Sequence, residues 1–271
     1  MIKLVATDID GTILGKSLEF TSGVKNCIKL MQDNGIKVVI VTGRMFAAAK
    51  LIARKLNLKT PVVAYQGGMI KENSDSDNIL YEACIPQDDI QRIIDWGRKN
   101  KAHLNLYSND VLYVEEDNET IKRYASAQNI DYNVCSFDDI ELKNVHKLLA
   151  IDYQNADLVT NWIKECQESL PHLYIVKSTP YFCEFSSHDA SKSCAVNFLK
   201  KYWDLKDEEV LTIGDQDNDI ELLKAGGIRV AMGNGTEGVK KEADFITDTV
   251  DNDGFVKAME KFVLGDIKCS K

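Results

Sequence analysis

The 271-residue sequence lacks several features that mark common classes of protein. Its seven cysteines are scattered and form no C-x-x-C pair, which excludes a zinc ribbon and a thioredoxin-like motif. No apolar run approaches the ~18 residues of a membrane span, and Asp8 comes too early for the apolar core of a signal peptide. We therefore expect a cytoplasmic protein with reduced thiols and no membrane partner.

An excess of positive charge is also missing. The formal net charge is −9, with 44% hydrophobic and 28% charged residues, which is typical of a soluble globular protein. Binding to a nucleic-acid backbone requires clustered Lys and Arg, so we expect no nucleic-acid partner. A small anionic substrate remains compatible with this charge, because a pocket can be locally positive in an acidic protein.

Several familiar catalytic signatures are absent as well. The sequence has no G-x-x-x-x-G-K-[ST], which excludes a P-loop, and no G-x-G-x-x-G after its first apolar run, which argues against a dinucleotide site. Its four histidines lie far apart without metal-ligand spacing. A Ser-His-Asp mechanism has no support in the sequence, although such triads need not be local.

Both ends of the chain alternate apolar runs with amphipathic segments. The runs 2–7, 36–42 and 61–65 are typical of buried strands, and helices are predicted between them. Thr21 or Ser22 is a candidate N-cap of the first helix, and Gly35 is a candidate stop. This order predicts parallel strands with right-handed crossovers. The pattern returns later in the chain, with helices expected at 190–203, 218–225, 236–242 and 253–262 and strands at 209–214, 228–232 and 244–247.

The middle of the chain has a different order of predicted strands and helices. Residues 69–83 predict a hairpin around the polar turn 73–78. Beyond it, strands come in adjacent pairs, and helices are expected between them, so the segment is typical of an α+β unit on an antiparallel sheet. We expect an α/β core domain of residues 1–84 and 187–271, interrupted by an inserted domain of residues 85–186. The paired strands are 103–108 with 111–116 and 173–179 with 181–186, and the helices lie near 87–99, 118–128 and 156–169.

Acidic residues follow two of the predicted core strands. Asp8 and Asp10 end the first strand, in "KLVATDIDGTIL". An Asx-rich turn would explain them, but the carboxyl ends of strands in an open α/β sheet are where ligands gather. Two carboxylates ~4 Å apart repel by roughly 1 to 4 kcal/mol, and a hard divalent cation such as Mg²⁺ would reverse that repulsion.

The second acidic group is "GDQDND" at residues 214–219, again directly after an apolar strand. An EF-hand loop starting at Asp215 would need Gly at its sixth position and Glu at its twelfth, where this sequence has Ile220 and Gly226. The calcium-loop interpretation therefore fails. Three aspartates and an asparagine at one strand end favour a cation site instead.

Two further segments carry groups suited to an anion. Thr42 and Gly43 end the second strand, where a hydroxyl beside a backbone amide can hold a phosphate oxygen, although such a turn is more often only a helix cap. Lys192 stands near the start of a predicted helix, where its charge opposes the helix dipole and an anion nearby would explain it. A carboxylate nucleophile, a metal site, a hydroxyl and a lysine together suit phosphoryl transfer through an aspartyl phosphate.

In this order the segments "DIDGT", "VTGR", "SKS", "GDQDND", "AMGNG" and "ADFIT" resemble the haloacid dehalogenase (HAD) superfamily. The resemblance is to its Cof-type sugar-phosphate phosphatases, which have a Rossmann-like core and a large inserted cap of type C2B. It implies that Asp8 is the nucleophile and a Mg²⁺ ligand. It also implies that Asp10 is the general acid and base and that the backbone carbonyl of Asp10 binds Mg²⁺. Asp215 would be the remaining protein ligand of Mg²⁺.

The resemblance also assigns the groups around the phosphate. Thr42 and the Gly43 amide would hold the phosphoryl group, and Lys192 would neutralise it and orient the nucleophile. Asn218 would contact phosphate, and Asp219 would support the metal site. The implied partner is a small phosphorylated metabolite, and the protein would be a monomer or weak homodimer.

The sequence departs from the family pattern at three places: Ser193 stands where Gly is usual, Gln216 where a small residue is common, and "YQGG" where Asn-Gly is more usual. Cap residues Tyr107, Asn109, Tyr113 and His188 are candidates for substrate contact, but none is assigned. Two other functions remain open. A phosphomutase would use the same nucleophile, and a non-catalytic protein would bind a phosphorylated metabolite without turnover.

Overall fold

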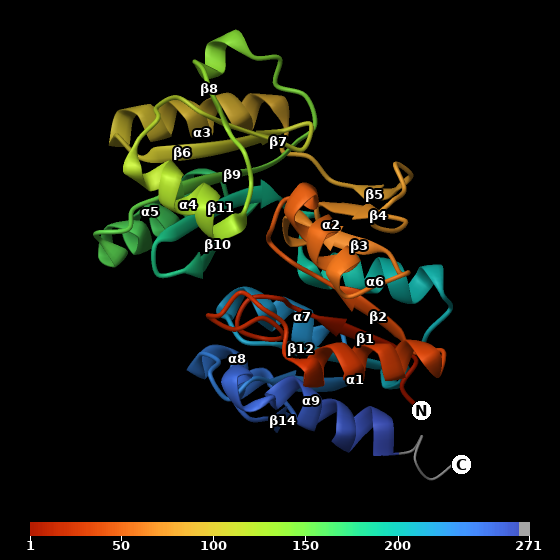
Figure 1. Cartoon of the computed structure of the whole chain (residues 1–271). Helices are drawn as coiled ribbons and strands as arrows, with labels where there is room; N and C mark the ends of the chain where they lie inside the picture. Colours follow the sequence, from red (N-terminus) through yellow and green to blue (C-terminus); the bar gives the residue numbers. More distant parts are fainter. Residues whose placement is uncertain (266–271) are drawn as a thin grey trace.

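A five-stranded parallel sheet forms the lower half of the molecule in Figure 1. The computed structural model describes residues 1–265. Every neighbouring pair of strands in this sheet is parallel, as the alternation of apolar runs and helices predicted. The order across the sheet is β14 (Phe245–Ile246), β13 (Ile228–Ala231), β12 (Val210–Gly214), β1 (Leu4–Thr7) and β2 (Lys37–Ile40).

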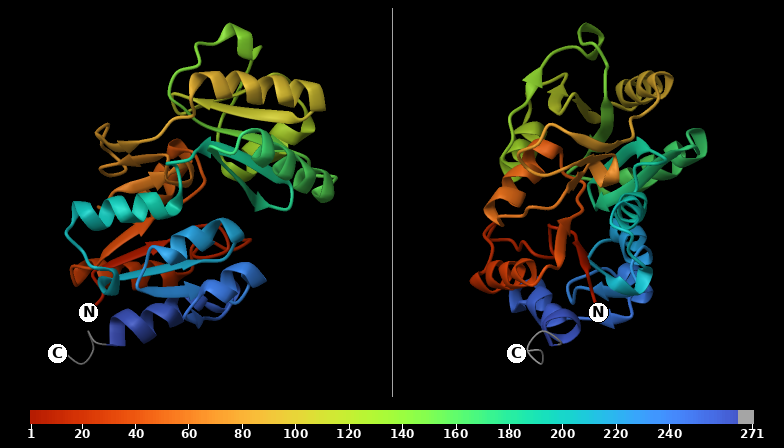
Figure 2. Two further views of the ribbon diagram at one scale, coloured as in Figure 1. Left: turned by 180° about the vertical axis from the view of Figure 1, so that it is seen from behind. Right: turned by 90° about the vertical axis from the view of Figure 1, so that its right-hand side faces the viewer.

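Helices cover both faces of this sheet because its strand residues are apolar at consecutive positions (Figure 2). Val5 points to the side packed by α1 and α9, whereas Leu4 and Ala6 pack with α6 and α7 on the other side. Thr21 caps α1, as expected, and Gly35 follows its end with φ +77°. We call this sheet and its helices the core: α1 (Ser22–Asp33), α2 (Phe46–Lys55), α6 (Lys192–Tyr202), α7 (Ile220–Lys224), α8 (Glu237–Glu242) and α9 (Gly254–Met259).

The third predicted strand does not extend the parallel sheet. Its residues form β3 (Val62–Ala64), which pairs antiparallel with β4 (Met69–Lys71), itself paired with β5 (Ile79–Glu82). One parallel bridge, Val41 to Val63, joins this small sheet to the end of β2. The expected parallel pairing of strand 61–65 is therefore present only at this one bridge, because β3 otherwise pairs with β4, the first strand of the predicted hairpin.

A second sheet, in the upper half of Figure 1, is built by the middle of the chain. The two predicted antiparallel pairs are present as β6–β7 and β10–β11. We call this sheet and its helices the cap: the strand order is β10 (Leu173–Thr179), β11 (Phe182–Ser187), β9 (Val145–Ile151), β6 (His103–Ser108), β7 (Val111–Val114) and β8 (Asn133–Val134), with α3 (Gln87–Asn100), α4 (Glu119–Gln128) and α5 (Ala156–Ser169).

Strand β9 was not predicted from the sequence, although it lies at the centre of the cap sheet between β11 and β6. Its residues alternate between two hydrophobic clusters. Leu148 and Ala150 pack with α3 and α5, whereas Leu149 and Ile151 pack on the side of α4 and the core. The fold is thus α/β, with a Rossmann-like core and an α+β cap. The exact limits 1–84, 187–271 and 85–186 stay a prediction.

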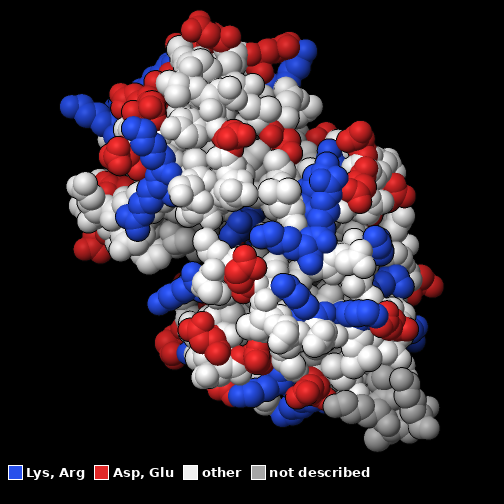
Figure 3. All heavy atoms as spheres, in the orientation of Figure 1, with Lys and Arg blue, Asp and Glu red and all other residues white. Residues whose placement is uncertain are grey.

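Among residues 1–265, no helix is long and apolar enough to cross a membrane. The six cysteines in this part of the chain form no disulfide. Cys269 lies outside the described residues. On the face seen in Figure 3, Lys and Arg side chains gather between the core and the cap, although the chain as a whole is acidic. Such local positive charge favours the approach of an anion.

Candidate active site

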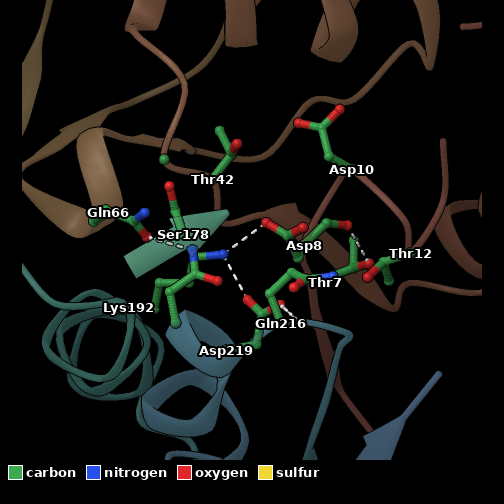
Figure 4. Close-up of polar contacts among 12 residues, drawn as sticks. Thr7, Asp8, Asp10, Thr12, Thr42, Gln66, Ser178, Lys192, Gln216 and Asp219 are labelled. Carbon is green, nitrogen blue, oxygen red and sulfur yellow. Dashed lines mark hydrogen bonds and ion pairs between the residues drawn. The ribbon is translucent and has the colours of Figure 1, made fainter. Parts of the chain in front are cut away.

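A buried lysine between two carboxylates forms the centre of the candidate site (Figure 4). Lys192 is the first residue of α6, and its Nζ donates to Asp8 Oδ1 and to Asp219 Oδ1, each at 2.6 Å. Asp8 directly follows β1, and Asp219 lies in the turn after β12. The structure therefore brings together residues 184 and 27 positions apart in the sequence.

A hydrogen bond joins the loops after β1 and β12, since Thr12 Oγ1 donates to Asp215 Oδ1 at 3.1 Å. Within the second loop, the side chain of Gln216 donates to Asp215 Oδ2 at 2.8 Å. Gly11 has φ +82°, and a Cβ there would stand 2.3 Å from Asp215 Oδ2. Glycine is thus required both for the backbone conformation and for the close approach of the second loop.

Burial makes this acidic cluster costly without a cation. Burial raises the pKa of Asp8 well above its usual value against the opposing effect of Lys192. Burial and the Asp219 charge raise the pKa of Asp215 to about 7. Burial alone would lower the pKa of Lys192, but Asp219 and Asp8 raise it above its ordinary value, so the ammonium stays charged.

The residues present fit a hard divalent cation. Asp8, Asp215 and Asp219 each offer a carboxylate oxygen within 4.8 Å of the others. Both oxygens of Asp219 are already engaged, because Oδ1 accepts from Lys192 and Oδ2 accepts from the amides of Asp215 and Gln216 at 2.9 and 3.0 Å. Asp215 accepts from the neutral side chains of Thr12 and Gln216, which are more easily displaced than an ammonium and two backbone amides. Asp8 and Asp215 are therefore more available to a metal than Asp219, which holds their surroundings in place.

Asp10 makes a different contact from its neighbour. Its carboxylate turns away from Lys192 in Figure 4 and accepts two hydrogen bonds from Arg44, at 2.8 and 2.6 Å. The Asp10 side chain is about half exposed, whereas that of Arg44 is 10% exposed. This bidentate pair fixes Asp10 at the mouth of the site. Arg44 stands in the "TGR" segment, but the sequence alone gave no reason to separate it from an ordinary turn residue.

The expected phosphate-binding residues lie on the same side of the site. The Thr42 hydroxyl accepts from the Arg44 amide at 3.2 Å, and Thr42 is buried. Asn218 Nδ2 donates to Gln66 Oε1 at 3.3 Å, while Asn218 Oδ1 is buried without a partner among the described residues. Gly43 lies against Gln66, since a Cβ on Gly43 would come within 2.5 Å of Gln66 Nε2.

A cavity of about 410 Å³ opens onto these residues, and residues of the cap form part of its lining. All the sequence-predicted site residues except Lys192 and Asp219 line it. Those two stand behind it, where Lys192 contacts both Asp8 and Asp219. The cap lining was not predicted and consists of Tyr124, Gln128, Lys147, Ser178, Thr179, Pro180, Phe182 and Glu184.

A signal for two of these cap residues was present in the sequence. Lys147 and Glu184 are single charges inside otherwise apolar strand segments, "VHKLLAI" and "FCEF". A charge at such a position requires a buried partner or a ligand. The four cap residues considered from the sequence (Tyr107, Asn109, Tyr113 and His188) are not among the residues that line the cavity.

Comparison with known proteins agrees with this geometry. The family model of the haloacid dehalogenase-like hydrolases matches residues 5–259. A phosphatase-named protein of Streptococcus pyogenes is 30% identical, with 97% of this chain and 99% of that protein covered. The 5-amino-6-(5-phospho-D-ribitylamino)uracil phosphatase YcsE of Bacillus subtilis is 28% identical, with 97% and 96% covered.

Solved structures give the same result. A haloacid dehalogenase-like hydrolase from Bacteroides thetaiotaomicron superposes with a TM-score of 0.85 at 28% identity, covering 96% of this chain and 99% of that one. A phosphatase of the same superfamily from that organism gives a TM-score of 0.82 at 29% identity, covering 97% and 95%. The chain therefore belongs to the haloacid dehalogenase-like hydrolases and is a phosphatase of that superfamily.

Proposed function

We propose that the protein is a Mg²⁺-dependent phosphomonoesterase that hydrolyses small phosphorylated metabolites, sugar phosphates in particular, through an aspartyl phosphate on Asp8. The observation that carries the proposal is the buried Lys192, which holds Asp8 at the floor of the cavity. A lysine in this position orients the nucleophile and offsets the negative charge of an incoming phosphate.

The metal ligands would be the carboxylates of Asp8 and Asp215 and the backbone carbonyl of Asp10. The chemistry that Mg²⁺ supplies there is neutralisation of charge on the phosphoryl oxygens, which lowers the repulsion of an attacking carboxylate. Asp219 supports this site by accepting hydrogen bonds from the backbone amides of Asp215 and Gln216, which follow β12.

The remaining steps belong to the protein's own groups. Asp8 attacks phosphorus, and Thr42, the Gly43 amide and Asn218 hold the phosphoryl oxygens. Asp10 gives its proton to the leaving alkoxide, and as a carboxylate it then takes a proton from the water that attacks the aspartyl phosphate. Arg44 keeps Asp10 at the mouth of the site, where both transfers take place.

The names of relatives support a phosphate ester as substrate. One is a phosphatase of a phosphorylated ribitylamino compound, and another, from Saccharolobus solfataricus, is a phosphoglycolate phosphatase. A small phosphorylated metabolite is therefore the proposed partner. A cytoplasmic location and a monomeric or weakly dimeric state stay predictions.

The test is hydrolysis of p-nitrophenyl phosphate by the purified protein with Mg²⁺ and with EDTA. We expect turnover that requires Mg²⁺ and is lost in Asp8→Asn, while the exposed control Asp77→Asn stays active. Full activity in Asp8→Asn would contradict the mechanism. An isomerised phosphate ester as product would favour a phosphomutase, and tight binding without hydrolysis would favour a protein that only binds its ligand.

A further inference from the structure

Two charged residues of the cap face the catalytic cavity as a buried pair. Lys147 on β9 and Glu184 on β11 lie on adjacent strands, and their side chains are 3.1 Å apart. They are 4% and 5% exposed. The alternation of β9 and β11 sends their apolar neighbours Leu148 and Phe185 to the opposite face, so the pair occupies the side that looks toward the core.

Each member of the pair has further partners across the junction with the core. Lys147 Nζ donates to the Gly43 carbonyl at 2.9 Å. Glu184 accepts from Gln66 Nε2 at 3.1 Å and from the Ser178 hydroxyl. Burial would raise the pKa of Glu184, but Lys147 and these hydrogen bonds outweigh it, so the pKa is lowered and the group is charged. The two side chains therefore form a buried ion pair.

The charge balance of the whole cavity follows from this pairing. Arg44 and Lys147 are the basic residues among its described lining residues. Arg44 is neutralised by Asp10, and Lys147 is neutralised by Glu184. The remaining cap lining is uncharged: Tyr124, Gln128, Ser178, Thr179, Pro180 and Phe182. Beyond the phosphoryl site, the lining contributed by residues 1–265 thus presents no uncompensated positive charge to the leaving group.

Such a buried pair need not stabilise the fold, because apolar residues of similar size often give the same free energy of unfolding. Its position beside the leaving group instead affects which substrates can bind. A second phosphate or a carboxylate on the substrate would meet Glu184 and Asp10 with no free cation to offset it. A hydroxyl would meet neutral donors and acceptors, such as the side chains of Gln128, Ser178 and Thr179 that line the cavity.

We propose that the Lys147–Glu184 pair sets the charge selectivity of this enzyme, so that it hydrolyses phosphomonoesters with an uncharged, hydroxyl-bearing leaving group and rejects those with a second anionic group. Glu184 is the specificity-determining residue, because it neutralises Lys147, the cap cation among the described residues that line the cavity. This inference rests on the proposed phosphatase function.

The experiment compares kcat/KM for sorbitol 6-phosphate and 6-phosphogluconate, two open-chain esters that differ by one terminal carboxylate. We expect the wild-type protein to prefer the neutral ester by about tenfold or more, because the extra carboxylate would lose water on entering a partly buried cavity in which Lys147 is already paired with Glu184. Equal rates, or a preference for 6-phosphogluconate, would overturn the proposal.

Three variants separate charge from structure. Glu184→Gln should lower the preference by about tenfold because Lys147 is released, and Lys147→Met should raise it because Glu184 is left alone. The double variant should return it near the wild-type value, and the exposed Glu208→Gln should leave it unchanged. Shifts of the same sign in both single variants would show a merely structural role and overturn the proposal.

Two controls keep this test apart from the test of function. Hydrolysis of p-nitrophenyl phosphate, whose leaving group has no carboxylate or second phosphate, should stay at the wild-type level in the exposed control Glu208→Gln, and thermal melting shows which of the other variants fold. If the wild-type protein hydrolyses p-nitrophenyl phosphate but does not discriminate between the two esters, only the selectivity proposal fails. If it hydrolyses none of the three esters, the proposed function fails first.

Discussion

The catalytic cluster of the core and the polar junction between core and cap are both buried, yet they are built differently. In the cluster, Lys192 is shared between two carboxylates, and burial raises the pKa of Asp8 and of Asp215. In the junction, Lys147 pairs with the single carboxylate of Glu184, which also accepts hydrogen bonds from Gln66 and Ser178. The cluster sets three carboxylates against one ammonium, and its excess negative charge is offset by protons or by a bound cation. In the junction the charges of Lys147 and Glu184 offset each other.

This difference predicts what each region contributes. Uncompensated charge in a site shielded from water can take part in catalysis, because buried carboxylates can bind a metal ion and a buried ammonium can bind a phosphate. A balanced pair cannot bind a second ion strongly, and it acts by fixing position and selecting partners. Changes in the cluster should therefore remove turnover, and changes in the junction should alter substrate choice or stability.

The largest effect is expected for Lys192→Met. Loss of the ammonium leaves Asp8 and Asp219 facing each other and removes the charge that offsets the phosphate, so kcat/KM should fall by about 10²- to 10³-fold or more. Steady-state hydrolysis of p-nitrophenyl phosphate measures this fall. Lys201→Met, which changes an exposed lysine at the other end of the same helix, should keep most of the activity. Comparable losses in both variants would contradict the account.

A pair of glycine variants tests how tightly the cluster is built. Gly11→Ala and Gly35→Ala both place a side chain at a positive φ, at a cost of about 1–2 kcal/mol each. A Cβ at Gly35 meets nothing within 4 Å, whereas one at Gly11 would lie 2.3 Å from Asp215. Gly11→Ala should therefore lose more stability than Gly35→Ala and should also weaken Mg²⁺ binding. Denaturant unfolding with and without Mg²⁺ measures both effects, and equal losses in the two variants would exclude the close contact.

The excess charge of the cluster should appear in the pH dependence of stability. The folded-state pKa of Asp215 is raised from 3.8 to about 7, so the metal-free protein gains stability as pH falls through 7 and loses it as pH rises. Mg²⁺ competes with that proton, so it should raise the Tm by more at pH 8 than at pH 6. Thermal melting at both pH values tests this. In Asp215→Asn the Mg²⁺ effect should disappear, and an equal Tm shift at both pH values in the wild-type protein would contradict the assignment.

The smallest effect is expected at the junction. The Tyr65 hydroxyl donates to Asp110 Oδ1 of the cap at 2.6 Å, and its ring stacks on His146 at 4.9 Å. Tyr65→Phe keeps the ring and removes the hydrogen bond, so stability should fall by about 1 kcal/mol and hydrolysis of p-nitrophenyl phosphate should persist. Denaturant unfolding and steady-state kinetics measure the two quantities. A loss of turnover comparable to that of Lys192→Met would mean that the junction takes part in the chemistry itself.

The same comparison explains what the sequence could predict. The groups of the cluster each sit at the end of an apolar strand or the start of a helix, so Asp8, Asp215 and Lys192 were found from local pattern. Parallel strands then bring their ends to one edge of the sheet, which predicts the cluster without coordinates. The helices and parallel strands of the core followed from the same patterns, except for the pairing of β3.

The junction could not be predicted in this way. Lys147 and Glu184 are 37 positions apart, and they meet only because β9 inserts between β6 and β11. Since β9 was itself missed, neither the strand pairing nor the facing of these charges could be derived. Arg44 shows the same limit on a smaller scale, because its partner Asp10 lies on another loop 34 positions away. Contacts between elements depend on register, which apolar periodicity alone does not determine.

The most direct test of the central claim is to trap the phosphorylated nucleophile. The protein is mixed with p-nitrophenyl phosphate and Mg²⁺, quenched in acid within the first turnover and treated with borohydride, which reduces an aspartyl phosphate to homoserine. Peptide mass spectrometry should find homoserine at position 8, and only when both ester and Mg²⁺ were present. Turnover at the normal rate without homoserine at position 8, under conditions that trap a standard acyl phosphate, would contradict the account.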